Sequence, residues 1–392
     1  MDDGIPTVAV ACQGGGTHAA FEAGVLTEIL GDLSAGRFRL TGLSGTSAGA
    51  LCALAAWYGL VGKDGKPGSP DEAIRTLNGF WDGFAAVTPA EILQNSTAQF
   101  AIRAQEQEVP LLGLTLPGFG LTPRGLFSHA LITTFRQLGV RETYFDFDVL
   151  LQTAFPGFDA IDWTSAPTRL LLGASEIVDG IETVFDSDCN AAAETTAATT
   201  AEKHAPTSIE NRWRTRKPLS LRGAAASGTL PGVREAEEVD GGFYWDGLYS
   251  QNPPVREFFS GVRKEAVPDE IWVIRINPQQ TPTVPVSNAD IIDRENELMG
   301  NLSLNKELDF LLIVNSMIAR FGDGVAHTYK PVTVRTIKMT RETAFGLRVS
   351  SKYDRSRIFI DTLRAEGRKV GRGWLDAWPN VGRYPDDAAY DR

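Results

Sequence analysis

The sequence predicts an α/β fold, because short apolar strands alternate with helices from the N-terminus onward. Residues 7–12 are apolar and partly β-branched and predict a buried strand, and a helix is expected over 19–30. A second strand is predicted over 38–43. The uncharged stretch 48–62 predicts a buried helix that is too short to span a bilayer. A glycine cluster stands between each of these strands and the helix that follows it.

Further elements follow in order along the chain. Ser69-Pro70-Asp71-Glu72 has the form of a capping box with proline at the first helical position, which predicts a helix from residue 70, and Thr88-Pro89 repeats this start signal. Apolar, β-branched runs and helical periodicity predict the remaining elements. These are strands at 170–175, 182–185, 270–277 and 332–339, and helices at 289–321, 355–367 and 369–378.

Composition limits the classes of function. The chain has 392 residues and a net charge of -11, which disfavours nucleic acid as a partner. Its three cysteines lack metal-ligand spacing, so neither a disulfide framework nor a zinc site is expected. No signal-like or membrane-spanning segment is evident, which predicts a cytoplasmic protein and leaves peripheral contact with a membrane open.

The two glycine clusters carry the chemistry. Gly45-Thr46-Ser47-Ala48-Gly49 matches G-x-S-x-G, in which a serine nucleophile stands on a sharp turn from strand to helix. Gly14-Gly15-Gly16 forms a loop between a strand and a helix, and its free N–H groups are suited to hold a developing negative charge. Together the clusters predict acyl transfer.

A serine nucleophile needs a base, and the sequence offers two aspartates. Asp240 and Asp246 are each followed by glycine, so both are expected at tight turns that present a carboxylate. Asp-Gly is a common turn dipeptide, and neither motif alone identifies the base. None of the four histidines has a recognisable context. The order Ser47, Asp246, His327 fits an α/β-hydrolase triad, but the serine precedes the strands that usually come before it in that fold.

The chain resembles the patatin-like phospholipase family. The segments that carry the resemblance are QGGGTHAAFEAGVL, GTSAGAL and YWDGLYSQNPP, and weaker likenesses extend it from about residue 6 to about residue 378. The resemblance implies a three-layer α/β/α sandwich around a central, mostly parallel sheet. It implies one domain over 1–392, with a core at 6–280 and a C-terminal helical extension at 281–392. An alanine- and threonine-rich stretch at 190–205 is expected to be a mobile insertion.

The resemblance also assigns residues. It implies Ser47 as nucleophile and Asp246 as base, since the family's asparagine-proline follows Asp246 and not Asp240. The implied oxyanion hole consists of Gly14, Gly15, Gly16 and Ala48, and the candidate substrate contacts are Thr17, His18 and Arg222. No metal or other cofactor is expected.

Three departures from the family pattern stand out. His18 and Ala19 replace the arginine or lysine and the glycine that usually follow the triple glycine, so stabilisation of the oxyanion is expected to differ here. Leu248 replaces the small residue that usually follows Asp-Gly.

The implied function is hydrolysis of fatty acyl esters, of the phospholipase A or lysophospholipase type, through an acyl-enzyme. A phospholipid or another fatty acyl ester is the expected substrate. Two alternatives stay open: an acyltransferase that uses the same residues, and a non-catalytic lipid-binding or regulatory protein.

Two further stretches allow more than one interpretation. The uncharged segment 109–123 is either a packed connection or a flap over an apolar substrate. The basic run that holds Arg214 and Arg216 favours a solvated or ion-paired segment, with a phosphate-contacting patch as the alternative.

Overall fold

The structure is a computed structural model of the chain. It describes residues 4–61, 67–106, 140–161, 163, 166–190, 213–231, 234–260, 262–322 and 329–384. The predictions for 109–123 and His327 lie outside these residues, as does nearly all of the insertion predicted at 190–205. Within the described part, no helix is both long enough and apolar enough to cross a membrane.

The centre of the fold is a mostly parallel sheet, as predicted. Its main path runs in the order β5-β4-β3-β2-β1-β8-β9, and β7 joins the side of β3 with β6 paired to it. The strands are β1 (Thr7–Cys12), β2 (Arg39–Thr46), β3 (Arg169–Glu176), β4 (Ile181–Asp186), β5 (Arg214–Pro218), β6 (Glu237–Val239), β7 (Gly242–Asp246), β8 (Glu270–Arg275) and β9 (Thr333–Lys338). Antiparallel pairing is confined to β3–β4, β3–β7 and β6–β7 among these strands.

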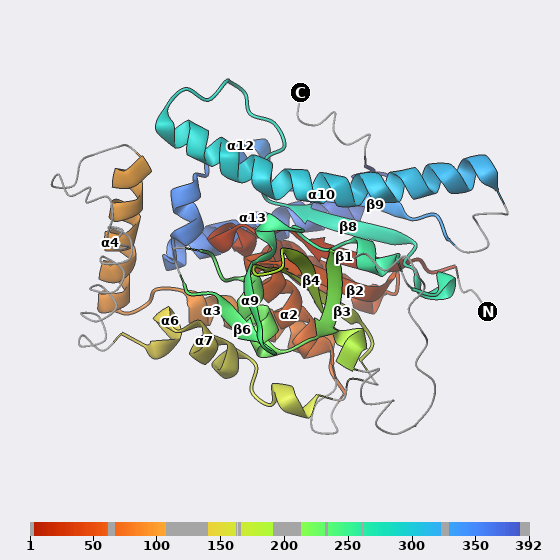
Figure 1. The fold of residues 1–392 in the computed structure, drawn as a ribbon, viewed down its shortest axis with the longest axis horizontal. Coiled ribbons are helices and arrows are strands. Elements are labelled where there is room, and N and C mark those ends of the chain that lie inside the picture. Colours follow the sequence, from red (N-terminus) through yellow and green to blue (C-terminus); the bar gives the residue numbers. More distant parts are fainter. Residues whose placement is uncertain are drawn as a thin grey trace.

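Helices cover both faces of the sheet (Figure 1). The described α-helices are α1 (Ala20–Asp32), α2 (Ala48–Leu60), α3 (Pro70–Phe84), α4 (Pro89–Glu106), α6 (Glu142–Phe145), α7 (Phe147–Ala154), α9 (Leu221–Ser227), α10 (Asn288–Phe321), α12 (Arg341–Gly346) and α13 (Arg357–Ala377). One apolar core joins β1 and β2 to α1, α2, α3 and α13. A second core joins the other face to α10. The α/β/α layering expected from the sequence is therefore present.

The local signals near the N-terminus are accurate. The strand at Thr7–Cys12 has the predicted bounds, and α2 contains no charged residue and is almost wholly buried. Ser69 caps α3 as predicted, because its hydroxyl accepts a hydrogen bond from the Glu72 N–H at 3.1 Å.

One expectation about secondary structure is wrong, and one strand in the basic run was not predicted. The two closing helices are one continuous helix, α13, in which Gly367 and Gly371 lie against the backbone of α1. These glycines do not break the helix, because they give the close approach between the two helices. The basic run contains a strand, β5, whose charge masked its tendency to form one.

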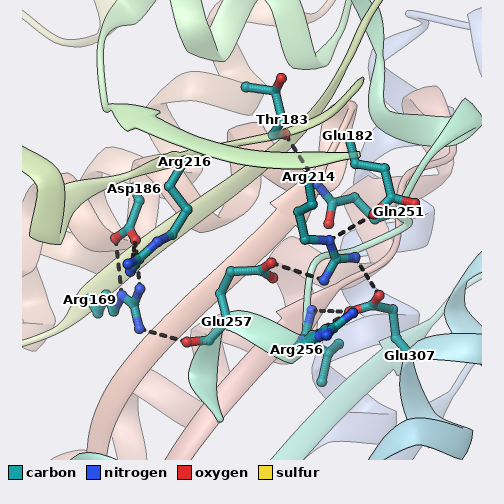
Figure 2. A network of polar contacts seen from close by, with 11 residues as sticks. Arg169, Glu182, Thr183, Asp186, Arg214, Arg216, Gln251, Arg256, Glu257 and Glu307 are labelled. Atoms are coloured by element: carbon teal, nitrogen blue, oxygen red, sulfur yellow. Dashed lines mark hydrogen bonds and ion pairs between the residues drawn. The ribbon is translucent and has the colours of Figure 1, made fainter. Parts of the chain in front are cut away.

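The interpretation of the basic run as ion-paired is confirmed for Arg214 (Figure 2). Its guanidinium contacts the carboxylates of Glu182, Glu257 and Glu307 at 2.7, 3.0 and 2.6 Å. Glu307 belongs to α10, and its second oxygen accepts the Arg256 N–H at 2.9 Å. This charged cluster therefore ties α10 to the sheet and to the segment that follows β7.

Candidate active site

Ser47 stands on a strained turn between β2 and α2. Its backbone has φ 58° and ψ −132°, and positive φ is uncommon for a residue other than glycine. The turn requires glycine on both sides: a Cβ at Gly49 would lie 2.5 Å from the Cys12 carbonyl oxygen, and one at Gly45 would meet Gly49. This is the geometry of a nucleophile elbow, and strain of this kind is common at functional sites.

Asp246 reaches Ser47 through the pairing of β3. Strand β2 pairs with β3 as far as Thr46 and Gly173, and β7 takes over the same edge of β3 from Ala174, which pairs with Asp246. The last residue of β7 therefore lies where the chain leaves β2 for the elbow. The two residues are almost 200 positions apart in the sequence, and the sheet brings them together.

The Asp246 carboxyl is fully buried. Its Oδ1 accepts the Leu248 N–H at 2.8 Å, whereas Oδ2 has no hydrogen-bond partner among the described residues. Burial raises the pKa of Asp246 to about 7, and the nearby Ser47 hydroxyl lowers it only in part. The Ser47 hydroxyl therefore lies near the Asp246 carboxyl, but the two groups do not form a short, well-aligned hydrogen bond.

The glycine loop lies directly against Ser47. A Cβ at Gly14 would lie 2.9 Å from Ser47 Cβ. The Gly14 N–H is already occupied, because it donates to Asn252 Oδ1 at 2.6 Å. Among the described residues no acceptor is found for the N–H groups of Gly15, Gly16 and Ala48. These three donors are therefore the ones left for an oxyanion.

Three positioning residues escaped the sequence analysis. Asn252 links the Asp246 loop to Gly14, and Gln13 Oε1 accepts the Ile276 and Asn277 N–H groups at 3.0 Å each. Ser227 accepts the Ser47 N–H at its carbonyl and at its hydroxyl, at 3.1 and 3.0 Å. Asn252 lies in the asparagine-proline pair that favoured Asp246, so a signal for it was present. Ser227 lies in AAASGTLPG, one of the segments with a weaker likeness to the family, but that likeness assigns it no role.

The remaining candidates occupy different surroundings. Asp240 lies exposed at the turn between β6 and β7 with φ 49°, away from the elbow that Asp246 adjoins. Thr17 Oγ1 is buried and has no hydrogen-bond partner among the described residues. His18 is buried and shares a 2.7 Å hydrogen bond with Ser351 Oγ. Arg222 lies near the start of α9 in an ion pair with Glu237 at 2.9 Å, and its contact with substrate stays a prediction.

The class defined by this fold is an α/β sandwich with a serine elbow beside a buried carboxylate. A model of the patatin-like phospholipase family matches residues 10–259, more than half of the chain. The chain belongs to the patatin-like phospholipase family, a family of lipid hydrolases. No curated protein matches it in sequence.

Two solved structures are remotely similar to the chain. The crystal structure of the type III effector protein ExoU has a TM-score of 0.31 and 13% identity, over 95% of this chain and 53% of ExoU. VipD from Legionella pneumophila has a TM-score of 0.29 and 12% identity, over 91% of this chain and 67% of VipD. The chain thus spans about half the length of the first structure and two thirds of the second. Likeness at this level carries no conclusion about activity.

Proposed function

We propose that the protein is a lipid acyl hydrolase that uses Ser47 as nucleophile and Asp246 as base. The observation that carries the proposal is the meeting of the two side chains along β3, with the elbow backbone strained at Ser47 and the carboxyl buried at Asp246. A carboxyl whose pKa lies at about 7 is suited to accept and return a proton near neutral pH.

The reaction proceeds in two halves. Asp246 takes the hydroxyl proton of Ser47 as the serine oxygen attacks the ester carbonyl, and the N–H groups of Gly15, Gly16 and Ala48 bind the resulting oxyanion. The proton passes from Asp246 to the departing alcohol, which leaves an acyl-enzyme. Water then loses a proton to Asp246 and attacks the acyl carbon, and the fatty acid leaves as the proton returns to Ser47.

The substrate class follows from the family and is part of the proposal. A fatty acyl ester is the expected substrate, and a phospholipid is the natural member of that class. Transient contact with a membrane surface is also part of the proposal, because phospholipids are presented at such surfaces.

Covalent trapping tests the proposal. The protein is incubated with a fluorophosphonate and digested, and we expect the mass of the adduct on the peptide that contains Ser47. In parallel, a medium-chain p-nitrophenyl ester and phosphatidylcholine vesicles are supplied as substrates, and fatty acid release should fall in step with labelling. Label on another residue, or hydrolysis that persists in fully labelled protein, would refute the dyad.

A further inference from the structure

A lysine from the C-terminal part of the chain lies against the glycine loop. Gly16 has φ +59°, and a Cβ there would collide with the carbonyl oxygen and Cβ of Lys352. Lys352 belongs to a short helical turn, η8 (Val349–Tyr353), which packs on the turn η1 (Gly16–Ala19). Because Gly16 has no side chain, the glycine loop can lie in contact with Lys352.

The lysine ammonium is linked to the loop through one amide. Lys352 Nζ donates to Asn277 Oδ1 at 2.9 Å, and Asn277 Nδ2 donates to the Gly14 carbonyl at 3.1 Å. The ammonium also donates to Asn296 on α10. Both acceptors are neutral amides, and within the described residues Lys352 forms no ion pair with a carboxylate. Its positive charge is thus held in place without being neutralised by contact.

His18 does not supply a charge here, although it occupies the loop position at which a cation was expected. Burial lowers the pKa of His18 well below its usual value, and the positive charge of Lys352 lowers it further. The ring is neutral at pH 7 and is held by Ser351, the neighbour of Lys352. His18 and the lysine therefore form one contact between η1 and η8, in which only the lysine is charged.

We infer that Lys352 is a positioning residue that provides the positive charge for the glycine loop and for Asp246, and so stabilises the oxyanion and the ionised base. The inference rests on the proposed function of Ser47 and Asp246. It assigns a role to a residue beyond 10–259, the part of the chain that matches the family. A cation near the site favours the negative charge that develops on the substrate oxygen.

The surroundings set the pH at which this charge is present. The charged and titratable groups that face Lys352 are His18 from η1, Asp246 from β7, Asp293 and Glu297 from α10, and Arg348 beside η8. Burial lowers the pKa of Lys352 to about 8, and the three carboxylates oppose this shift. A cavity of about 20 Å³, lined by Lys352 and by all of these groups except Asp246, is large enough for one water molecule.

The expected pH profile is a narrow bell. Activity rises as Asp246 ionises at a pKa of about 7 and falls as Lys352 loses its proton at about 8. Lys352→Arg stays charged at higher pH, so we expect activity within a few-fold of wild type and an alkaline limb displaced upward. Lys352→Met should lower kcat/KM about tenfold or more near pH 7.5, and should move the acid limb to higher pH because Asp246 loses a neighbouring cation.

The matched control is Lys369→Met, which removes an exposed lysine of α13 and should leave the profile unchanged. Glu297→Gln provides a second test that keeps the lysine, since it removes a carboxylate facing Lys352 and should move the alkaline limb to lower pH. A purely structural lysine would lower thermal stability in Lys352→Met without moving either limb, and arginine would not restore the rate. Either result would overturn the inference.

A titration separates this inference from the proposed function. Lysine side chains are observed by NMR after isotope labelling, and the Lys352 signal is identified by its loss in Lys352→Arg. We expect its midpoint near pH 8 in the wild type, and lower in Asp246→Asn, because the ionised carboxylate favours the ammonium. An unchanged midpoint would refute the coupling even if the esterase activity is present. A shifted midpoint in a protein without esterase activity would instead refute only the proposed function.

Discussion

Two buried groups of charges lie on the sheet, and they are built in opposite ways. In the charged cluster around Arg214, the guanidinium contacts three glutamates directly, at distances up to 3.0 Å (Figure 2). At the candidate active site, Asp246 and Lys352 contact amide groups, and neither has an ion pair among the described residues. The pKa of Arg214 is raised by its partners, whereas burial lowers the pKa of Lys352 to about 8.

The difference separates charges that hold the fold from charges that react. A buried cation with direct partners is fixed in one ionisation state and one geometry, and removing it leaves unpaired charges behind. A carboxyl without a close cation keeps a pKa near neutral pH and can exchange a proton. Four substitutions test this contrast, from the largest expected effect to the smallest.

Ser47→Ala should have the largest effect, because it removes the nucleophile. We expect kcat for a medium-chain ester to fall on the order of 10³-fold or more. The unfolding free energy should change by less than about 1 kcal/mol, since alanine keeps the backbone and the Ser47 N–H bonds to Ser227. A stopped assay of fatty acid release measures kcat, and urea unfolding measures the unfolding free energy. Ser96→Ala, which changes an exposed serine of α4, is the matched control, and equal rates in both variants would contradict the assignment.

Asp246→Asn should separate activity from stability. The rate is expected to fall about 10²- to 10⁴-fold, the usual contribution of a general base. The folded pKa of about 7 lies above the ordinary value of 3.8, so ionising Asp246 costs stability that is lost progressively as pH rises from about 4 to 7. The neutral amide avoids this loss, and we expect Asp246→Asn to be more stable than wild type by about 1–3 kcal/mol at pH 8 and equal to it near pH 4.

Urea unfolding at the two pH values measures this effect, and Asp240→Asn is the control for the rate. Asp240 is exposed on the β6–β7 turn, so its amide variant should keep wild-type activity. If Asp240→Asn were the inactive variant, the base would have to be reassigned.

The sequence was sufficient to predict the elements that depend on local signals. The strand before Gly14, the helix after Ser47 and the capping box at Ser69 depend on neighbouring residues, and all three lie where the pattern predicted them. Asp246 could be preferred to Asp240 only through the family resemblance, because the pairing of β7 with β3 is not visible in composition or spacing.

The remaining contributions come from distant segments. Lys352 reaches the glycine loop only because α10 and η8 fold back over the end of β8, and no local pattern predicts such an approach. Strand β5 was missed because its charged residues resemble a solvated segment, although Arg214 is largely buried by its glutamate partners. Contacts between distant segments therefore explain why the sequence analysis missed both the place of Lys352 and strand β5.

Arg214→Met tests the charged cluster, in which the buried cation is directly ion-paired. It leaves Glu182, Glu257 and Glu307 without their shared cation, and we expect a loss of about 3–5 kcal/mol in unfolding free energy. Arg216→Met is the matched control on the same strand: its side chain is 44% exposed and pairs with Asp186 at 3.3 Å, so a loss of about 0–1 kcal/mol is expected. Urea unfolding at pH 7 measures both, and similar losses would show that burial of the pair does not matter here.

Glu257→Gln should have the smallest effect, although Glu257 belongs to the same cluster. Burial raises the pKa of Glu257 to about 7, and the charge of Glu307 adds to this while Arg214 opposes it. Because the pKa is raised, the folded protein loses stability as pH rises from about 4.5 toward 7. At pH 6 the carboxyl is still largely neutral, and glutamine is a close substitute for it there. We expect a change below about 1 kcal/mol at pH 6 and a gain in stability relative to wild type at pH 8.

A loss of about 3 kcal/mol or more at pH 8 would instead mean that Arg214 requires all three negative charges. All three glutamates of the charged cluster would then be needed in their ionised form. Of the two carboxyls compared, only Asp246 would then have a pKa near neutral pH.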